Sequence, residues 1–414
     1  MTWEFSPFLQ FATELILILT VAKLGGYLST RLGQPSVLGE LLAGILLGPS
    51  LLNINGLTII TNPQELNSFI RELGELGVLL LMFLAGMELH LTELVKNFRV
   101  SVRIALLGVM LSFFLVGFVT YAATGGMSQA IFIGLALSAT SISISAQTLL
   151  ELKVLKGRVG LALLGSAVVD DILVLAMFSI VTAISDGKNS WVSIGELLVR
   201  LAAFLVIALA TGRWILPRLT RWVTRRLPGY GAVTYALVVL LVFGVLAEWL
   251  GGISAILGAF LAGLMFSRLE EKVAVEPGIR ALTYTLFAPV FFVSIGLQVD
   301  LHLIRTESLI LLGFLVLAAV GGKFLGAGLG ARWAQFSWQQ AAQVGSGMVP
   351  RGEVSLIIAS VCIAQGLIDS GIFSAVVGAV IITTLITPLL IKVTFTPTSN
   401  GKSENVEMSR SETK

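Results

Sequence analysis

Apolar residues in this chain gather into long runs, separated by short stretches that carry turn-forming and charged residues. An α-helix needs about 17 to 25 mostly apolar residues to cross the hydrocarbon core of a bilayer. Runs of that kind predict thirteen helices and an all-α polytopic membrane protein. In chain order they lie near residues 8–30, 36–52, 73–90, 101–124, 129–150, 158–185, 193–217, 232–250, 252–268, 280–298, 306–331, 338–365 and 371–394.

The composition agrees with a membrane protein. Hydrophobic residues make up 56% of the chain and charged residues only 12%, whereas soluble domains carry about a quarter of charged residues. The one cysteine, Cys362, excludes an intramolecular disulfide and any site built from several cysteines. The first apolar run carries Glu14 and Lys23 and leads directly into further runs, so no cleavable signal peptide is expected.

Positive charge alternates between the two sides of the predicted membrane segments. One side holds only four lysines and arginines, namely Arg71, Lys188, Arg200 and Arg305, and the other side holds most of the rest. By the positive-inside rule the richer side is cytoplasmic, so the N-terminus is expected outside and the C-terminus inside. The polar residues 397–414 are expected to form a disordered cytoplasmic tail. A bacterial-type inner or plasma membrane, or an internal energised membrane, is the expected location.

Two short motifs recur in the second half of the chain. Residues 38–44 read LGELLAG and residues 257–263 read LGAFLAG, while residues 83–89 (FLAGMEL) parallel residues 293–299 (VSIGLQV). Seven predicted helices separate the members of each pair, and an odd displacement reverses the direction through the membrane. The pattern predicts two inverted six-helix repeats, an architecture common in secondary transporters. The expected division is residues 1–190, a linking helix at 191–217, and residues 218–396.

Two adjacent aspartates, Asp170 and Asp171, lie in the middle of the apolar run 158–185. A carboxylate at membrane depth costs several kcal/mol, roughly 2.5–3.5 by insertion scales, so membrane proteins keep such groups mainly for function. Consecutive residues on a helix point about 100° apart, so the two carboxylates are expected to have different partners. The alternative is a structural salt bridge or a misplaced helix.

Further polar residues are expected at the same depth. Thr140 and Ser141 lie in the hydroxyl-rich stretch SATSISIS of the fifth predicted helix, and Arg351 and Glu353 lie in the sequence GSGMVPRGE of the twelfth. These two helices hold corresponding positions in the two halves, and interrupted helices at matching positions are the best sequence indication of a transporter site. Thr140 is either an ion ligand or a hydroxyl that satisfies unwound backbone. Arg351 and Glu353 form either a structural charge pair or part of the site.

Lys323 lies eight residues from the end of the eleventh predicted helix. It either extends to an interface or points inward, and the neighbouring stripe of Gly322, Gly326 and Gly330 favours an inward, closely packed face. A phosphate-binding loop is excluded, because the first glycine of that motif and the preceding strand are missing.

The aspartate pair, the residue 138–148 stretch, Lys323 and the Arg351-Gly352-Glu353 sequence together resemble the sodium/proton antiporters of the cation/proton antiporter superfamily. Within it, the chain is most similar to the NapA-like branch of thirteen helices, which also includes the Kef potassium-efflux proteins. The resemblance covers residues 8–394 and implies an NhaA-like fold with two crossed discontinuous helices. It also implies a homodimer, held together by helices one to three and eight to ten.

The resemblance also implies a role for each site residue. Asp171 would bind either a proton or an alkali cation, and Asp170 would pair with Lys323 when no cation is bound. Thr140 and Ser141 would offer oxygens to the cation, with Arg351 and Glu353 close by. The Kef-type regulatory domain and the Kef replacement of the first aspartate by glutamine are both missing, which favours sodium over potassium.

The residues therefore predict a secondary transporter, not an enzyme, that exchanges Na⁺, and also Li⁺, for H⁺ without a cofactor or a nucleic-acid partner. Competition of the two ions for Asp171 would couple their fluxes, and proton release from Lys323 would make the exchange electrogenic. The alternatives are a K⁺/H⁺ antiporter of the same fold and, less favoured, a cation channel. An intramembrane aspartyl protease does not fit, because adjacent aspartates on one helix cannot form a dyad built from two helices.

Overall fold

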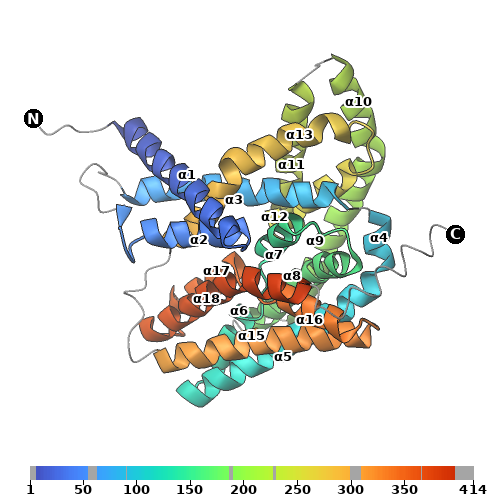
Figure 1. Ribbon diagram of the computed structural model, residues 1–414. Helices are drawn as coiled ribbons and strands as arrows, with labels where there is room; N and C mark the ends of the chain where they lie inside the picture. Colours follow the sequence, from blue (N-terminus) through green and yellow to red (C-terminus); the bar gives the residue numbers. More distant parts are fainter. Residues whose placement is uncertain are drawn as a thin grey trace, which may run out of the picture.

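The computed structural model describes residues 6–54, 63–89, 91–185, 190–226, 230–298, 309–364 and 366–396. Among these residues there are helices, turns and bends but no β-strand (Figure 1). Eight helical stretches of the described chain are long and apolar enough to cross a membrane. The fold is therefore all-helical and polytopic. The predicted tail 397–414, Lys188 and Arg305 lie outside the described residues.

The helices follow one another with short connections. The first half of the chain forms α1 (Pro7–Arg31), α2 (Ser36–Leu47), α3 (Pro63–Met87), α4 (Leu91–Lys96), α5 (Phe98–Thr124), α6 (Met127–Ala136), α7 (Ile142–Glu151) and α8 (Arg158–Ser185). A long rod follows, made of α9 (Ser190–Ala210), the π-helical turn η2 (Thr211–Ile215) and α10 (Leu216–Arg226). The second half forms α11 (Gly231–Trp249), α12 (Ala255–Phe266), α13 (Lys272–Leu282), the π-helical turn η3 (Thr283–Phe287), α14 (Ala288–Leu297), α15 (Leu309–Trp333), α16 (Trp338–Gly347), α17 (Glu353–Ala364) and α18 (Ser370–Phe395).

Several helix boundaries predicted from the apolar runs were wrong. The third helix begins at Pro63 rather than residue 73, the tenth at Lys272 rather than 280, and the seventh continues to Arg226 rather than 217. Each added stretch is polar or amphipathic, and a hydropathy pattern registers only the part of a helix that is apolar. The second helix ends early, at Leu47, because Gly48 adopts an extended conformation.

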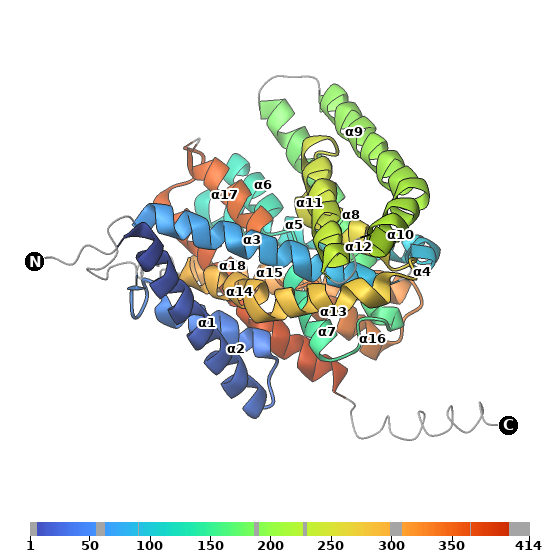
Figure 2. The ribbon, with the colours of Figure 1, turned by 90° about the horizontal axis from the view of Figure 1, so that it is seen from above.

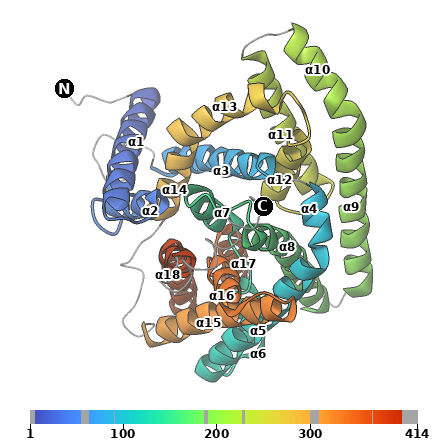
Figure 3. The ribbon, with the colours of Figure 1, turned by 45° about the vertical axis from the view of Figure 1, so that its right-hand side comes forward.

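The helices form two groups. In Figure 1, α1, α2, α3 and α11 to α14 lie in the upper part, while α5, α6 and α15 to α18 lie in the lower part. Figure 2 shows α3 running beside α13 and α14. The rod of α9 and α10 follows one edge of the molecule (Figure 3). Both α7 and α8 lie near the middle in Figures 1 and 3, and Asp170 of α8 is fully buried.

Close packing of α5 against α15 depends on the glycine stripe. A Cβ atom would lie 2.6 Å from Ser112 Cα at Gly322, and 2.5 Å from Leu107 O at Gly326. At Gly330 it would lie 2.6 Å from Arg103 O. Such contacts are too short for any side chain, so the predicted packing face is confirmed.

The two recurring motifs pack against each other across the halves. On α2, a Cβ at Gly44 would lie 2.3 Å from Val293 O of α14. On α12, a Cβ at Gly263 would lie 2.0 Å from Phe83 O of α3. In each case the last glycine of the LGELLAG or LGAFLAG motif in one half contacts the helix that carries the VSIGLQV or FLAGMEL segment in the other half. That exchange is the contact pattern expected of repeats related by a two-fold axis.

Candidate functional site

Two interrupted helices meet at the centre of the site. The α6–α7 segment leaves the helical conformation at residues 137–141, and the α16–α17 segment does so at residues 348–352, as the hydroxyl run and the glycine-proline sequence predict. The breaks contact each other directly. The N–H of Ser141 donates to Pro350 O at 2.8 Å, and Ser145 Oγ donates to Gly347 O at 2.6 Å. Each break therefore uses polar groups of the other to satisfy backbone that has left its helix.

Asp170 on α8 joins the first break to α15. Its carboxylate accepts a hydrogen bond from the Lys323 ammonium, and both side chains are 0% exposed. The backbone N–H of Thr140 donates to the other carboxylate oxygen at 3.1 Å. The ion pair that the resemblance implies is therefore present, and it lies directly beside the unwound residues. Its part in transport remains a prediction.

Asp171 lies about 100° further round α8 and is partly exposed, unlike its neighbour. Its charge also acts on Lys323. The Thr140 hydroxyl is 3.5 Å from Met348 O, at the outer limit of a hydrogen bond. The Ser141 hydroxyl lies 3.1 Å from that of Ser143. The first break thus contacts Asp170 through the Thr140 backbone, while the Thr140 and Ser141 hydroxyls contact Met348 O and Ser143.

Arg351 is fully buried in the second break and bonds to neutral oxygens. Its guanidinium donates to Ala139 O at 3.1 Å, to Ser138 O at 3.4 Å, to Ala319 O at 2.6 Å and to Ser112 Oγ at 3.1 Å. Two of these acceptors are carbonyls that the break in the first segment leaves without helical N–H partners. The sequence favoured a charge pair with Glu353, whose side chain lies outside the described residues. Three of the four described hydrogen bonds of Arg351 satisfy backbone carbonyls, a role that the sequence did not predict.

The described part of the site contains two acidic and two basic side chains. Asp170, Asp171, Lys323 and Arg351 sum to a formal charge of zero, a sum that does not include Glu353, whose side chain lies outside the described residues. Both cations act electrostatically on Asp170, the nearest carboxylate. Any alkali cation that bound here would add a charge to a balanced and largely buried cluster.

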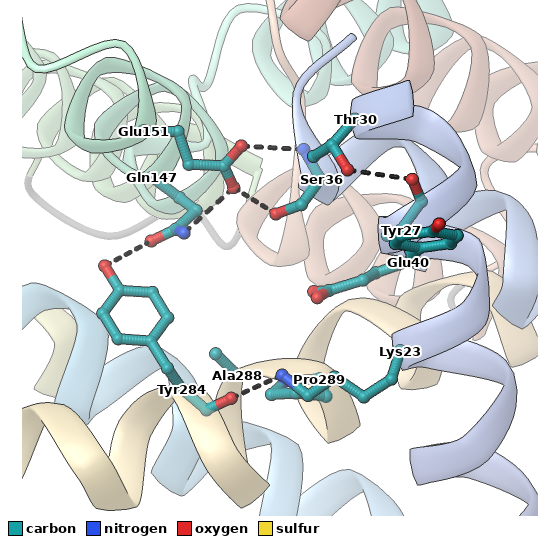
Figure 4. Close-up of a pocket in the computed structure, with 11 residues that line it drawn as sticks. Lys23, Tyr27, Thr30, Ser36, Glu40, Gln147, Glu151, Tyr284, Ala288 and Pro289 are labelled. Carbon is teal, nitrogen blue, oxygen red and sulfur yellow. Dashed lines mark hydrogen bonds between the residues drawn. The ribbon is translucent and has the colours of Figure 1, made fainter. Parts of the chain in front are cut away.

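A second polar region, which the sequence did not single out as a site, lies between α1, α2, α7 and η3. Here a cavity of about 360 Å³ is lined by Lys23, Ser36, Glu40, Gln147, Glu151 and Tyr284, among others (Figure 4). Lys23 and Glu40 stand out in the sequence as charges in apolar runs, but the other four lie near segment ends. Within the described chain, no group of three or more His, Cys, Asp and Glu residues could hold a metal ion, here or elsewhere.

Comparison of the sequence with known proteins shows the family to which the chain is similar. A family model described as "Sodium/hydrogen exchanger, transmembrane" matches residues 16–396. The chain is 39% identical to the Na⁺/H⁺-K⁺ antiporter GerN of Bacillus cereus over 93% of its own length and 96% of that protein. It is 36% identical to a Na⁺/H⁺ antiporter of Enterococcus hirae, over 93% and 98%.

The fold also has a counterpart among solved structures. The sodium proton antiporter MjNhaP1 of Methanocaldococcus jannaschii superposes with a TM-score of 0.64, covering 92% of this chain and 96% of that one. Sequence identity is 17%. This similarity supports the fold alone.

Proposed function

This chain belongs to the sodium/hydrogen exchanger family, and we propose that it exchanges Na⁺, and also Li⁺, for H⁺ by alternating access. It is a secondary transporter rather than an enzyme. The observation that carries the proposal is the charge-balanced cluster of two aspartates, Lys323 and Arg351 beside two crossed helix breaks. Its partners are monovalent cations, protons and the lipid bilayer, and it uses no cofactor.

Charge balance explains how the two ions would be coupled. A cation that reaches the cluster adds one positive charge at a depth where uncompensated charge is expensive. The cost falls if a proton leaves at the same time, and Asp171 is the group placed to exchange one for the other. Because the two ions compete for one carboxylate, neither crosses without the other.

Asp171 and the first helix break would supply the oxygen ligands for the cation. Sodium prefers hard oxygen ligands, which carboxylates, hydroxyls and unwound carbonyls supply. Asp171 would provide the carboxylate, and Thr140 and Ser141 the hydroxyl or backbone oxygens of the first break. Asp170 is already engaged with Lys323, which makes it a poorer ligand until that pair opens.

Opening of the pair would set the charge carried per cycle. If the cation displaces Lys323 from Asp170, a buried lysine without its counterion favours loss of its proton. Two protons would then move against one Na⁺, with a net transfer of one charge. Membrane potential would contribute about 2.3 kcal/mol per charge per 100 mV to such a cycle.

The architecture proposed for this cycle is the NhaA-like one. Thirteen membrane segments result when α6–α7, α16–α17, α9–α10 and α13–α14 are each counted once and the six-residue helix α4 is left out. The repeats would lie on either side of the linking helix, which the structure extends from Ser190 to Arg226 instead of ending it at residue 217, and the second repeat would end at residue 396. The matched breaks and the exchanged glycine contacts support this symmetry. A homodimer with a cytoplasmic C-terminus, in a bacterial-type inner, plasma or internal energised membrane, completes the proposal.

The test is ion exchange by the purified protein in liposomes that hold an imposed pH gradient. Addition of Na⁺ or Li⁺ is expected to dissipate the gradient, and a clamped inside-negative or inside-positive potential is expected to change the rate. A rate indifferent to voltage would remove the two-proton stoichiometry. Flux of Na⁺ without counter-movement of H⁺ would instead indicate a channel.

Potassium is the second candidate substrate. The printed name of the B. cereus relative includes K⁺ as well as Na⁺, and neither the aspartate pair nor the breaks determine ionic radius. The same liposome assay with K⁺ separates the two. Dissipation by K⁺ at concentrations where Na⁺ is ineffective would make the protein a K⁺/H⁺ antiporter.

A further inference from the structure

The cavity beside α2 lies apart from the aspartate cluster and is built from other helices. Its walls come from α1 (Lys23), α2 (Ser36 and Glu40), α7 (Glu151) and η3 (Tyr284), as Figure 4 shows. No residue of the cluster described above lines it. Its polar groups are therefore unexplained by the exchange site.

One carboxylate of the cavity has all the partners it needs. Glu151, the last residue of α7, accepts from the backbone N–H of Ser36 at 2.7 Å and from its hydroxyl at 2.6 Å. Gln147 Nε2 donates to the same carboxylate at 3.2 Å, and the Tyr284 hydroxyl donates to Gln147 Oε1 at 3.3 Å. This network ties the end of α7 to the start of α2, across 115 residues of sequence.

The other carboxylate has none within the described chain. Glu40 is 8% exposed, yet no described residue donates a hydrogen bond or forms an ion pair with it. The charge of Lys23 acts on Glu40, but the Lys23 ammonium donates its hydrogen bond to Tyr284 O at 2.7 Å. Figure 4 shows the Glu40 carboxylate pointing into the open cavity. A buried carboxylate is costly without a partner, and the space that this carboxylate faces is the cavity, where an ion or water can supply one.

The chemistry of the lining selects a monovalent cation. With both carboxylates ionised, Glu40 and Glu151 against Lys23 leave the lining with a formal charge of −1. Carboxylate, amide and hydroxyl oxygens are hard ligands that suit alkali ions. A cavity of about 360 Å³ also has room for a hydration shell, since each water occupies about 30 Å³. A tight divalent site would need more carboxylates, and the described residues form no such group.

We propose that this cavity binds a hydrated alkali cation at Glu40, as a second site distinct from Asp171, and that the bound ion stabilises the contact between α2 and α7. The binding stands on the cavity alone, whereas its influence on exchange rests on the function proposed above. The helix α7 begins beside the first break and ends at Glu151. A cation that holds this end in place favours the conformation described here over any in which α7 has moved.

Thermal unfolding of the detergent-purified protein tests the second site. Asp171→Asn removes the exchange site, so a rise in unfolding temperature of this variant in sodium chloride, against choline chloride at equal ionic strength, reports binding elsewhere. The rise is expected in Asp171→Asn and is expected to vanish in Asp171→Asn with Glu40→Gln. No rise in the first variant, or an unchanged rise in the second, would overturn the proposal.

Two further variants serve as controls for the assignment of the sodium effect to Glu40. Glu14→Gln, added to Asp171→Asn, removes a buried α1 carboxylate whose oxygens have no described partner and which does not line the cavity, and the sodium effect is expected to survive. Gly26→Ala keeps every charge but adds a methyl 3.4 Å from Glu40 Oε1. It is expected to raise the half-saturating Na⁺ concentration several-fold, and an unchanged value would count against the site even if the Glu40 variant failed to fold.

Failure of the proposed function would look different. If the unaltered protein exchanged no Na⁺ for H⁺ in liposomes, antiport would be wrong while the sodium effect on Asp171→Asn could still stand. Where exchange is present, Glu40→Gln is expected to retain it. The dependence of its rate on the Na⁺ concentration, on the side of the membrane where Glu151 lies, is expected to change. Exchange with an unaltered Na⁺ dependence would remove the influence of this site on transport.

Discussion

Two clusters of ion pairs in this protein use the same chemistry in different surroundings. In one, Asp170 and Lys323 are both 0% exposed between α8 and α15. In the other, Glu88 follows the end of α3 and is 13% exposed, while its partners Lys156 and Arg280 are 68% and 42% exposed. The first pair is surrounded by protein and the second is open to water.

The contrast separates a buried pair, to which we assign a part in exchange, from a cluster that fixes the position of a helix end. Desolvation of two ions costs as much as their attraction returns, so a fully buried pair is weak evidence of stabilisation. In the Glu88 cluster Glu88 is mostly buried but its cations Lys156 and Arg280 keep much of their hydration, and the cluster joins three elements that are distant in sequence. Lys272 adds to it by donating to the last carbonyl of α3, Met87 O, at 2.6 Å. This cluster holds the end of α3, whereas the buried pair is the one to which the proposed exchange cycle gives a part.

The largest effect is expected at the exchange site beside the buried pair. Asp171→Asn removes the titratable carboxylate, so sodium-dependent proton movement in liposomes is expected to fall to the level of liposomes without protein. As a matched control, Asp170→Asn combined with Lys323→Gln removes the neighbouring pair and is expected to retain exchange that no longer responds to voltage. Normal exchange by the Asp171 variant would move the site elsewhere.

The buried pair itself is expected to be costly to break from one side. Lys323→Met leaves Asp170 ionised and buried without its cation, which is expected to reduce the free energy of unfolding by about 3–5 kcal/mol. Asp170→Asn added to it removes the uncompensated charge and is expected to restore much of that loss. Denaturant unfolding in detergent measures both, and simple additivity of the two changes would show that the pair is not coupled.

Packing of α15 supports the pair, and adjacent glycines test it. Gly322→Ala would place a methyl 2.6 Å from Ser112 Cα and is expected to cost about 1–3 kcal/mol by forcing α5 and α15 apart. Gly321→Ala meets nothing within 4 Å and is expected to be neutral or stabilising, because alanine favours a helix by about 1 kcal/mol over glycine. Unfolding temperatures in detergent compare the two, and equal values would contradict the close contact.

The exposed cluster is expected to show the smallest effect. Glu88→Gln is expected to reduce the free energy of unfolding by at most about 1 kcal/mol, and less in high salt. Burial by itself would raise the pKa of Glu88, but hydrogen bonds and charges from Lys156 and Arg280 lower it below 4.5. Its contribution is therefore present above pH 4.5 and disappears as the pH falls through the lower folded-state pKa. Equal pH dependence of the variant and the unaltered protein would contradict this assignment.

Much of the site could be predicted from residue types alone. A run of hydroxyls and a Gly-x-x-Pro sequence favour an interruption of an apolar helix, so both breaks were expected from the sequence, although Ser143 and Ser145 of that run are helical. Aspartates and a lysine inside apolar runs were equally visible, because their desolvation cost makes them exceptional. Helix ends were less accurate, as with Lys272, because polar turns outside the hydrocarbon do not alter an apolar pattern.

The partners of the polar groups could not be predicted in the same way. Arg351 bonds to Ser138 and Ala139 carbonyls, which become acceptors only because the other segment unwinds beside it. Glu151 meets Ser36 because α7 ends where α2 begins, a contact without any local sequence signal. The cavity at Glu40 follows from the same meeting.

By itself, the sequence determined that the chain is a bundle of membrane helices, where two of them break, and which charges are held at depth. These are properties of segments, decided by the cost of apolar surface in water and of charge in lipid. Only the tertiary structure decided that Lys323 binds Asp170, that Arg351 serves the opposite break, and that Glu40 is left facing a cavity. Those outcomes depend on which helices lie side by side, and close approach at glycines such as Gly44 and Gly322 sets that arrangement.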